Sequence, residues 1–244
     1  MRIVPLSEGS FTVDASKRFV PFDEKKDSLQ ERPKGSLLVE IQPFLVITQR
    51  DMLLLDCGLG FSTGEGALQL HSNLAAQGVK AENITKVLLS HLHKDHAGGI
   101  LNAEGSAPAF PNARYYVQKK ELEAALANAH SSYQADRLEV LRGSADLELL
   151  DSGEGEIDGY IRYQMTSAHS KYHQVFWIRE NEEQLFFGGD DAPQLQQMKH
   201  RYVARYDHDG RRARELRNHW WEQGRKEGWT FLFYHDIAAA VVGR

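Results

Sequence analysis

Four side chains that commonly bind metal ions lie within residues 91–96, in the run His-Leu-His-Lys-Asp-His, directly after an apolar run at 87–89. Short β-branched and aliphatic runs of this kind are typical of buried strands. The polar cluster therefore belongs to a loop at the end of a strand, where Gly98 and Gly99 let the backbone turn closely. This context favours a metal site over a chance cluster among the 11 histidines of the chain.

The spacing within this loop allows two ions to be held. Residues two apart on an extended segment point to the same side, so His91 and His93 can hold one ion. A turn that begins near Lys94 brings Asp95 and His96 toward a second ion. Imidazole and carboxylate ligands suit zinc, iron, manganese, cobalt or nickel. A hydrolytic zinc site needs more protein ligands than this loop can place, so further ligands are expected elsewhere in the chain.

Three candidates downstream each follow a strand-like run. His169 comes after 160–166, Asp190 after 185–189, and His235 after 230–234. Two cations that lie close together need an anion between them to offset their repulsion, and a carboxylate can bridge them. Asp190 is the natural candidate for this bridging position.

The segments HLHKDHAGG, TSAH, FFGGD and FYHD, in this order, resemble those of the metallo-β-lactamase superfamily of hydrolases. The resemblance spans nearly the whole chain and includes LLLDCG at 53–58. Its aspartate, Asp56, would support residues 91–96, the metal loop, without itself binding an ion. It implies an α/β fold, the four-layer αββα sandwich, as a single domain over 1–244. It also implies two divalent metal ions, zinc before manganese, iron, cobalt or nickel. The ligands would be His91, His93 and His169 for the first ion, Asp95, His96 and His235 for the second, and Asp190 as the bridge.

Within the superfamily, the ligand order and the Phe-Tyr-His-Asp ending most resemble the dinuclear lactonases, including enzymes that open acyl-homoserine lactones. The resemblance implies hydrolysis of a small-molecule ester or lactone by a hydroxide between the metals, with Asp95 and Asp190 as catalytic residues. Thioester hydrolysis of the glyoxalase II kind, phosphodiester hydrolysis and β-lactam hydrolysis remain alternatives. A single-iron dioxygenase would not need His96 and His235, and flavodiiron proteins usually carry a glutamate where this chain has His93. A binding protein without turnover is the remaining alternative.

Several residues near the candidate ligands have more than one interpretation. Some lactonases have a tyrosine a few residues after the bridging aspartate, whereas this chain continues Asp191-Ala192-Pro193-Gln194. Asp191 either orients a ligand or only ends a strand. His173 is expected to be structural or to orient a ligand, and Cys57 to be a small buried residue rather than a ligand.

Length and composition bound the class of protein. With 244 residues and 41% hydrophobic content, the chain can bury the core of one sizeable domain. A net charge of −5 argues against a nucleic-acid partner. The first ten residues lack the pattern of a targeting signal, and no run is long and apolar enough for a membrane span. We expect a cytoplasmic protein that acts on a small molecule, and a homodimer is compatible with the family.

The apolar patterns predict strands at 3–5, 36–48, 52–55, 86–90, 114–118, 147–150, 157–166, 174–179, 184–187 and 230–234, and helices at 65–77, 119–128, 132–142 and from Asp209 to Gly228. The polar segment 16–35 is expected to be an exposed loop rather than a flap near the substrate. A cluster of cations is expected to form a solvated helix face rather than an anion-binding patch. Its members are Lys199, Arg201, Arg205, Arg211, Arg212, Arg214 and Arg217.

Overall fold

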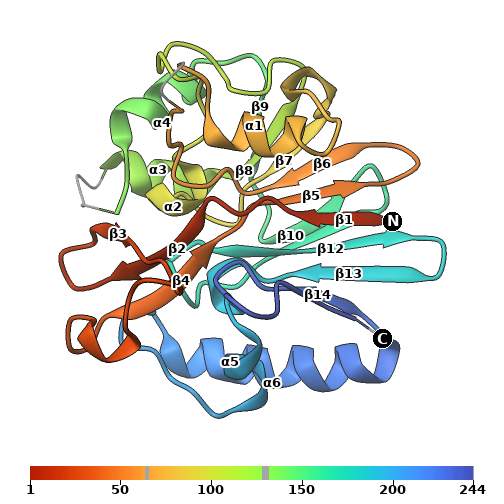
Figure 1. The fold of residues 1–244 in the computed structure, drawn as a ribbon. Coiled ribbons are helices and arrows are strands. Elements are labelled where there is room, and N and C mark those ends of the chain that lie inside the picture. Colours follow the sequence, from red (N-terminus) through yellow and green to blue (C-terminus); the bar gives the residue numbers. More distant parts are fainter. Residues whose placement is uncertain (64–65, 128–131, 244) are drawn as a thin grey trace.

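Two six-stranded sheets lie face to face at the centre of the computed structural model, with helices on both outer sides (Figure 1). The structure describes residues 1–63, 66–127 and 132–243. Helices α1, α3 and α4 cover one sheet, and α5 and α6 cover the other (Figure 1). A smaller three-stranded sheet stands beside one end of the two large sheets. The four-layer αββα arrangement expected from the sequence is confirmed.

The first sheet consists, in spatial order, of β1 (Arg2–Pro5), β5 (Phe44–Ile47), β6 (Met52–Leu55), β7 (Lys86–Leu88), β8 (Arg114–Gln118) and β9 (Leu147–Leu150). The second consists of β10 (Glu154–Ile157), β11 (Ile161–Met165), β12 (Gln174–Glu180), β13 (Glu183–Phe187), β14 (Thr230–Leu232) and β15 (Val241–Val242). The small sheet consists of β3 (Phe19–Pro21), β2 (Gly9–Val13) and β4 (Leu37–Ile41). The helices are α1 (Gln69–Ala75), α2 (Lys94–Ala97), α3 (Lys119–Ala127), α4 (Ala135–Arg142), α5 (Leu195–Lys199) and α6 (Gly210–Glu227), with short 3-10 turns η1 (Leu29–Glu31), η2 (Ala81–Asn83) and η3 (Gly189–Asp191).

Hydrophobic side chains fill all three interfaces between the layers. Successive strand residues point to opposite faces, so Leu54 packs on the side covered by α1, α3 and α4, while Leu53 and Leu55 pack between the two sheets. On the other side, Phe186 packs against Trp220 of α6. Both large sheets are therefore buried on both faces, which explains the continuous apolar runs that mark their strands.

Parallel pairing brings the ends of several strands to one edge of the sandwich. In the first sheet β6 runs parallel to β7, with Leu55 opposite Leu88. In the second sheet β13 runs parallel to β14, with Phe187 opposite Leu232. The segments that follow β6, β7, β13 and β14 therefore leave the sheets on the same side. These segments carry most of the candidate ligands.

Two predicted strands are wrong because each is in fact a pair of strands. The range 36–48 divides into β4, which pairs with β2, and β5, which pairs with β1 and β6. Pro43 lies at the break, where its missing N–H cannot contribute to a sheet. The range 157–166 divides at Asp158 and Gly159, which both have positive φ angles of 52° and 71°. An Asp-Gly pair of this kind forms a tight hairpin turn between β10 and β11.

The helix predictions are mostly confirmed, with shifts at the N-termini. α1 begins at Gln69 and α4 at Ala135, later than predicted, while Glu65 and Asn128 at the ends of two predicted helices lie outside the described residues. For α6 the Asp209 side chain accepts from the backbone N–H of Arg212, and Gly228 ends the helix at a φ of 74°. This cap pair matches the prediction.

The basic cluster is only in part the solvated face that was expected. Arg217 is fully buried, and its guanidinium donates to the backbone oxygens of Asp191 (3.0 Å) and Tyr202 (2.8 Å). The Nε of Arg212 donates to the backbone oxygen of Thr166. Both arginines hold α6 against loops that carry candidate ligands, but only Arg217 is buried and contradicts the prediction, whereas Arg212 is exposed.

Glu8 is a buried carboxylate that couples the fold to pH. Its Oε2 accepts from the backbone N–H of Leu59 (2.6 Å), and burial raises its pKa to about 7, against the opposing effect of the Leu59 and Gly60 amides. Because the folded state then holds the proton more tightly than the unfolded chain, this contribution to stability is full below pH 4.5 and is lost as the pH rises through 7.

We expect Glu8→Gln to reduce the fall in unfolding free energy between pH 5 and 8 by about 2 kcal/mol. Urea denaturation at both pH values measures this, with exposed Glu24→Gln as the control; equal pH slopes in the wild type and Glu8→Gln would refute it.

Candidate metal centre

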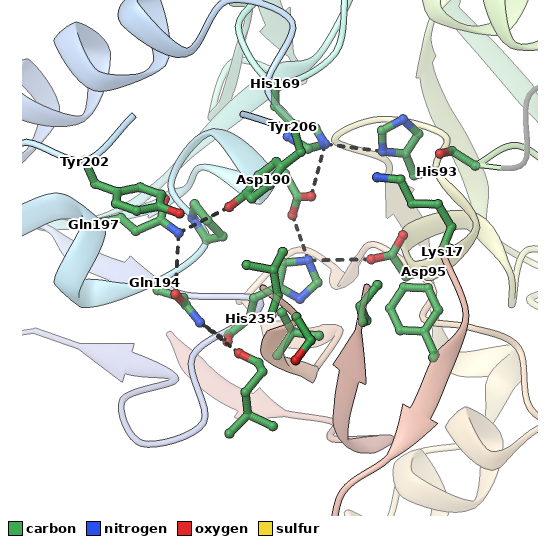
Figure 2. A pocket seen from close by; sticks show the side chains of 18 of the residues that line it. Lys17, His93, Asp95, His169, Asp190, Gln194, Gln197, Tyr202, Tyr206 and His235 are labelled. Carbon is green, nitrogen blue, oxygen red and sulfur yellow. Dashed lines mark hydrogen bonds and ion pairs between the residues drawn. The ribbon is translucent and has the colours of Figure 1, made fainter. Parts of the chain in front are cut away.

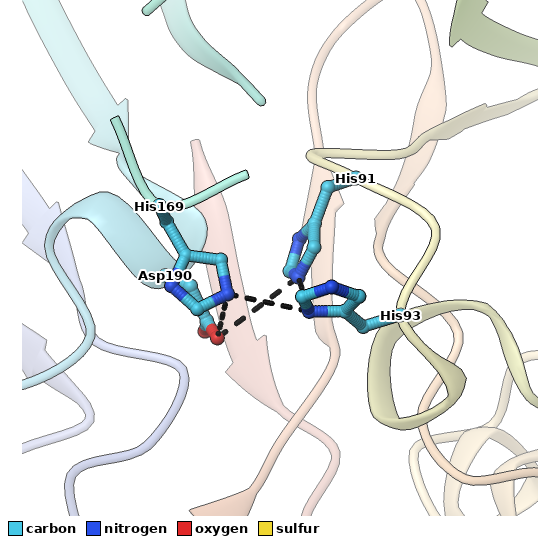
Figure 3. A group of neighbouring side chains, drawn as sticks. All are labelled: His91, His93, His169 and Asp190. Atoms are coloured by element: carbon cyan, nitrogen blue, oxygen red, sulfur yellow. Dashed lines mark hydrogen bonds and ion pairs between the residues drawn. The ribbon is translucent and has the colours of Figure 1, made fainter. Parts of the chain in front are cut away.

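All seven candidate ligands from the sequence lie together at the sheet edge, in two groups that share one carboxylate. In each group the possible ligand atoms lie within 4.8 Å of one another. The first group consists of His91, His93, His169 and Asp190, and the second of Asp95, His96 and His235. Figure 3 shows the first group, in which three imidazole rings and the carboxylate point toward one another although they come from three separate segments of the chain.

The first group is arranged around the ring nitrogens of its histidines. His91 Nε2 lies 2.9 Å from His93 Nδ1, which lies 3.3 Å from His169 Nε2. Oδ2 of Asp190 is 3.2 Å from His169 Nε2 and 4.0 Å from His91 Nε2. His91 and His93 of the metal loop therefore face one point, as expected from residues two apart on an extended segment.

Asp190 presents its other oxygen to the second group. Its Oδ1 is 3.1 Å from His96 Nε2 and 2.9 Å from His235 Nε2. Oδ2 of Asp95 lies 3.6 Å from both of these nitrogens. Asp190 thus stands between the two groups with one oxygen toward each, which is the geometry that a bridging carboxylate requires.

The outer ring nitrogens of three histidines are held by acceptors. Nδ1 of His96 faces Asp56 (2.7 Å), Nδ1 of His169 faces Asp207 (3.0 Å), and Nδ1 of His235 donates to the backbone oxygen of Glu40 (2.7 Å). A neutral imidazole that donates from Nδ1 has its lone pair on Nε2, which points into the cluster. His96 Nε2 and Asp190 Oδ1 are buried and have no hydrogen-bond partner among the described residues. This donor set, with buried acceptors left unpaired, fits divalent cations.

The electrostatics also favour positive charge between the two groups. Burial lowers the pKa of His91 and of His93, and the neighbouring histidines lower them further. Burial works against protonation of His96 as well, but the carboxylates of Asp190, Asp95 and Asp56 raise its pKa well above the usual value. For Asp190, burial is outweighed by the facing histidines, so its pKa is well below the usual range and it is ionised.

Asp56 and Ser90 hold the metal loop from beneath. Asp56 is fully buried with a φ of 57°, and its carboxylate accepts from the backbone N–H of Ser90 (2.7 Å) and from the Ser90 hydroxyl (2.7 Å) as well as facing His96. The Ser90 oxygen also contacts His91 Nδ1 (3.1 Å). One carboxylate thereby positions a histidine in each group.

The loop that carries His169 is fixed by two aspartates, of which the sequence pointed only to one. Asp191 accepts from the backbone N–H of His169 (2.7 Å) and contacts His173 Nδ1 (3.0 Å). His173 Nε2 accepts from the backbone N–H of Asp190 (3.2 Å). Asp191 and His173 thus orient ligand-bearing segments. Asp207 lies in a polar loop between α5 and α6 without apolar periodicity, and nothing in the sequence around it signals its contact with His169.

Two further buried residues support the same loops. Glu121 of α3 is 1% exposed and accepts from the backbone N–H of Leu92 (3.2 Å) and from the hydroxyl of Ser170 (3.1 Å), so it joins the metal loop to the His169 loop. The sequence analysis predicted the helix that carries Glu121 but did not single out this residue. Tyr234 stacks on His96 with ring centroids 4.1 Å apart and donates to the backbone oxygen of Asp95 (2.6 Å).

A cavity of about 490 Å³ opens directly onto both groups (Figure 2). Its wall includes His93, Asp95, His169, Asp190 and His235. The segment 16–35 contributes to the wall, so the expectation of an ordinary exposed loop is wrong for part of it. The rest of the wall combines apolar and aromatic side chains with polar ones. The apolar and aromatic residues are Val13, Phe19, Leu37, Leu38, Val39, Pro193, Tyr202 and Tyr206, and the polar residues include Gln194, Gln196, Gln197 and His200.

The sequence profile described as the Metallo-beta-lactamase superfamily matches residues 41–197, well over half of the chain. The chain belongs to the metallo-beta-lactamase superfamily. As a member of this superfamily of metal-binding hydrolases it is an enzyme, and its histidine and aspartate cluster fits the metal site of the family. The family resemblance inferred from the sequence motifs is confirmed.

Solved structures with the same fold include several hydrolases. A probable metal-dependent hydrolase from Staphylococcus aureus is 22% identical, with 99% of this chain and 91% of that chain covered and a TM-score of 0.79. AidC, a dizinc quorum-quenching lactonase in complex with a product, is 19% identical, with 96% and 87% covered and a TM-score of 0.73. An N-acyl homoserine lactone hydrolase with N-hexanoyl-L-homoserine at its catalytic metal center is 22% identical, with 96% and 92% covered and a TM-score of 0.68. At these identities the likeness shows a shared metallo-beta-lactamase fold.

Among proteins with curated descriptions, none matches this sequence significantly. Within the described ranges, no helix of this metallo-beta-lactamase superfamily member combines the length and apolar character needed to cross a membrane.

Proposed function

We propose that this chain hydrolyses a small-molecule ester or lactone at a centre of two divalent metal ions, zinc first among the candidates. The observation that carries the proposal is the position of Asp190, with one carboxylate oxygen toward each of two ligand groups. A single-iron dioxygenase would leave the second group without a purpose, yet Asp95, His96 and His235 converge as closely as the first group does. The dizinc lactonase AidC, which shares the fold, supports the same interpretation.

Two possible side-chain nucleophiles are unsuited to the reaction. Burial, and then the nearby carboxylates, raise the pKa of the Cys57 thiol, so this residue stays protonated. Ser90 contacts both Asp56 and His91, but it is 1% exposed and is not part of the cavity wall. We propose a water molecule as the nucleophile. Bound divalent cations polarise a carbonyl oxygen and lower the pKa of water to near neutrality.

The chain's own residues supply position, charge and a place for the proton. His91, His93 and His169 would hold the first ion, Asp95, His96 and His235 the second, and Asp190 would bridge them. In the reaction a water oxygen adds to the carbonyl carbon, the carbon–oxygen bond to the leaving group breaks, and an acid and an alcohol form. Asp95, which lines the cavity, would accept the proton of the water and return it to the leaving oxygen.

Removal and return of metal tests the proposal. We expect the chelated protein to lose ester and lactone hydrolysis and to regain it with two equivalents of zinc, manganese or cobalt, because the hydrolytic chemistry depends on both ions. Metal analysis and a substrate panel measure this: acyl-homoserine lactones, aryl esters, a glutathione thioester and bis-p-nitrophenyl phosphate. One equivalent of bound iron with oxygen consumption would contradict the proposal and indicate a single-iron dioxygenase. Hydrolysis of only the thioester or only the phosphodiester would assign the enzyme to that substrate class instead.

A further inference from the structure

Among the described residues, the cavity wall outside the metal centre has cations but no acidic side chain. The acidic side chains that line it are Asp95 and Asp190, both within the two ligand groups. Three basic side chains of the wall, Lys17, Arg32 and Lys94, come from the small-sheet region and from α2. The ammonium of Lys94 donates to the backbone oxygen of Lys17 (2.6 Å). Lys17 and Arg32 therefore remain as the cations to be explained.

Lys17 reaches the cavity from a strained turn. It lies between β2 and β3 with a φ of 59°, and its N–H donates to the backbone oxygen of Asp14 (3.1 Å). A lysine in this left-handed conformation costs about 1 kcal/mol, and glycine or asparagine is the usual choice there. In Figure 2 the Lys17 side chain extends into the cavity beside His93 and Asp95. Within the described part of the chain, its ammonium has no hydrogen-bond or ion-pair partner.

Arg32 reaches the same cavity from the segment after η1. Its Nε and Nη1 atoms are buried and find no hydrogen-bond partner among residues 1–63, 66–127 and 132–243. Buried charged donors that lack a partner carry a large desolvation cost, and such groups in a native protein generally have a role. Arg32 thus keeps unpaired N–H groups on a charged guanidinium, a donor that suits the carboxylate of a bound molecule.

We propose that Lys17 and Arg32 form an anion-binding subsite, and that the natural substrate is an ester or lactone whose acyl part carries a second, non-reacting carboxylate. The inference rests on the proposed function and adds the chemical class of the substrate. Apolar side chains of the same cavity wall, among them Val13, Phe19 and Leu38, suit a hydrocarbon segment that joins the two ends of such a molecule.

Matched esters test the subsite in the zinc-loaded protein. The monoester of adipic acid with p-nitrophenol carries a terminal carboxylate, and p-nitrophenyl hexanoate has the same acyl length without it. We expect kcat/KM to be about tenfold or more higher for the adipate monoester, because a charged hydrogen bond of this kind contributes that much. Lys17→Gln and Arg32→Gln should each lower this preference severalfold. Arg18→Gln removes a cation from an exposed position next to Lys17 that does not line the cavity, so it should keep the preference.

Binding of the two acids separates this inference from the proposed function. Adipate and hexanoate each offer one carboxylate to the metal centre, but only adipate offers a second to the subsite. Titration calorimetry should show about tenfold tighter binding of adipate, and Lys17→Gln and Arg32→Gln should each reduce this difference severalfold. If neither ester is hydrolysed, the proposed function fails while this titration still decides the subsite. Equal affinity for the two acids, or a preference for adipate that is unchanged in Lys17→Gln and Arg32→Gln, overturns the inference. If these residues had only a structural role, the variants would weaken the binding of both acids alike, which also overturns it.

Discussion

Asp190→Asn is expected to lower kcat/KM for ester or lactone hydrolysis by at least about a thousandfold. The amide is neutral, so it cannot offset the repulsion between two nearby cations. It also offers one acceptor oxygen instead of two, while Asp190 Oδ1 faces His96 and His235 and Oδ2 faces His169. The metal content should therefore fall from two equivalents to one or fewer. Elemental analysis of the desalted protein and steady-state kinetics measure both effects.

Asp207→Asn is the matched control for this variant. Asp207 contacts His169 Nδ1, on the side of the ring that faces away from the cluster, so its replacement leaves the ligand set intact. A change behind a metal-binding histidine typically lowers metal affinity or activity by 10–100-fold, and we expect a loss in this range. Circular dichroism and melting temperatures verify that both variants fold. Two retained equivalents of metal and near wild-type turnover in Asp190→Asn would show that this carboxylate is not a bridge.

The candidate ligands could be predicted because their signals are local. His91 to His96 follow a short apolar strand directly, and His169, Asp190 and His235 each follow another, so the pattern along the chain already places them at strand ends. The structure adds that β6 and β7, and likewise β13 and β14, are parallel, which brings these ends to one edge. The αββα layers could be predicted for a related reason, since strands buried on both faces have continuous apolar runs.

The cavity wall could not be predicted, because it depends on contacts between distant segments. The turn at Lys17 is held by Lys94, 77 residues later in the chain, and Asp207 meets His169 across 38 residues. Arg217 belongs to a run of charges that is typical of an exposed helix face. It is nevertheless buried, and its guanidinium donates to backbone oxygens of two other loops. Such pairings leave no periodic signal, so the sequence predicts the metal ligands far better than it predicts what surrounds the substrate.

Asp56→Asn is expected to weaken the second ligand group selectively, by about 10–100-fold in metal affinity. The carboxylate accepts from the Ser90 N–H, the Ser90 hydroxyl and His96 Nδ1 at once. An amide must turn its NH₂ toward one of them. If it faces His96, it donates to Nδ1 and moves the imidazole proton to Nε2, the nitrogen that faces Asp190. If it faces Ser90, a buried N–H loses its acceptor, which costs about 1–3 kcal/mol of stability.

The geometry of the backbone makes this variant informative, since asparagine tolerates the positive φ of 57° at position 56 as well as aspartate does. Zinc titration against a chelating dye should show one site of nearly wild-type affinity and one weakened site, and turnover should recover when zinc is added in excess. Ser90→Ala is the control, because it removes the hydroxyl that donates to Asp56 and leaves the contact between Asp56 and His96 in place. Recovery at high zinc would identify Asp56 as a residue that positions His96, whereas two sites of unchanged affinity would mean that the tautomer of His96 does not depend on it.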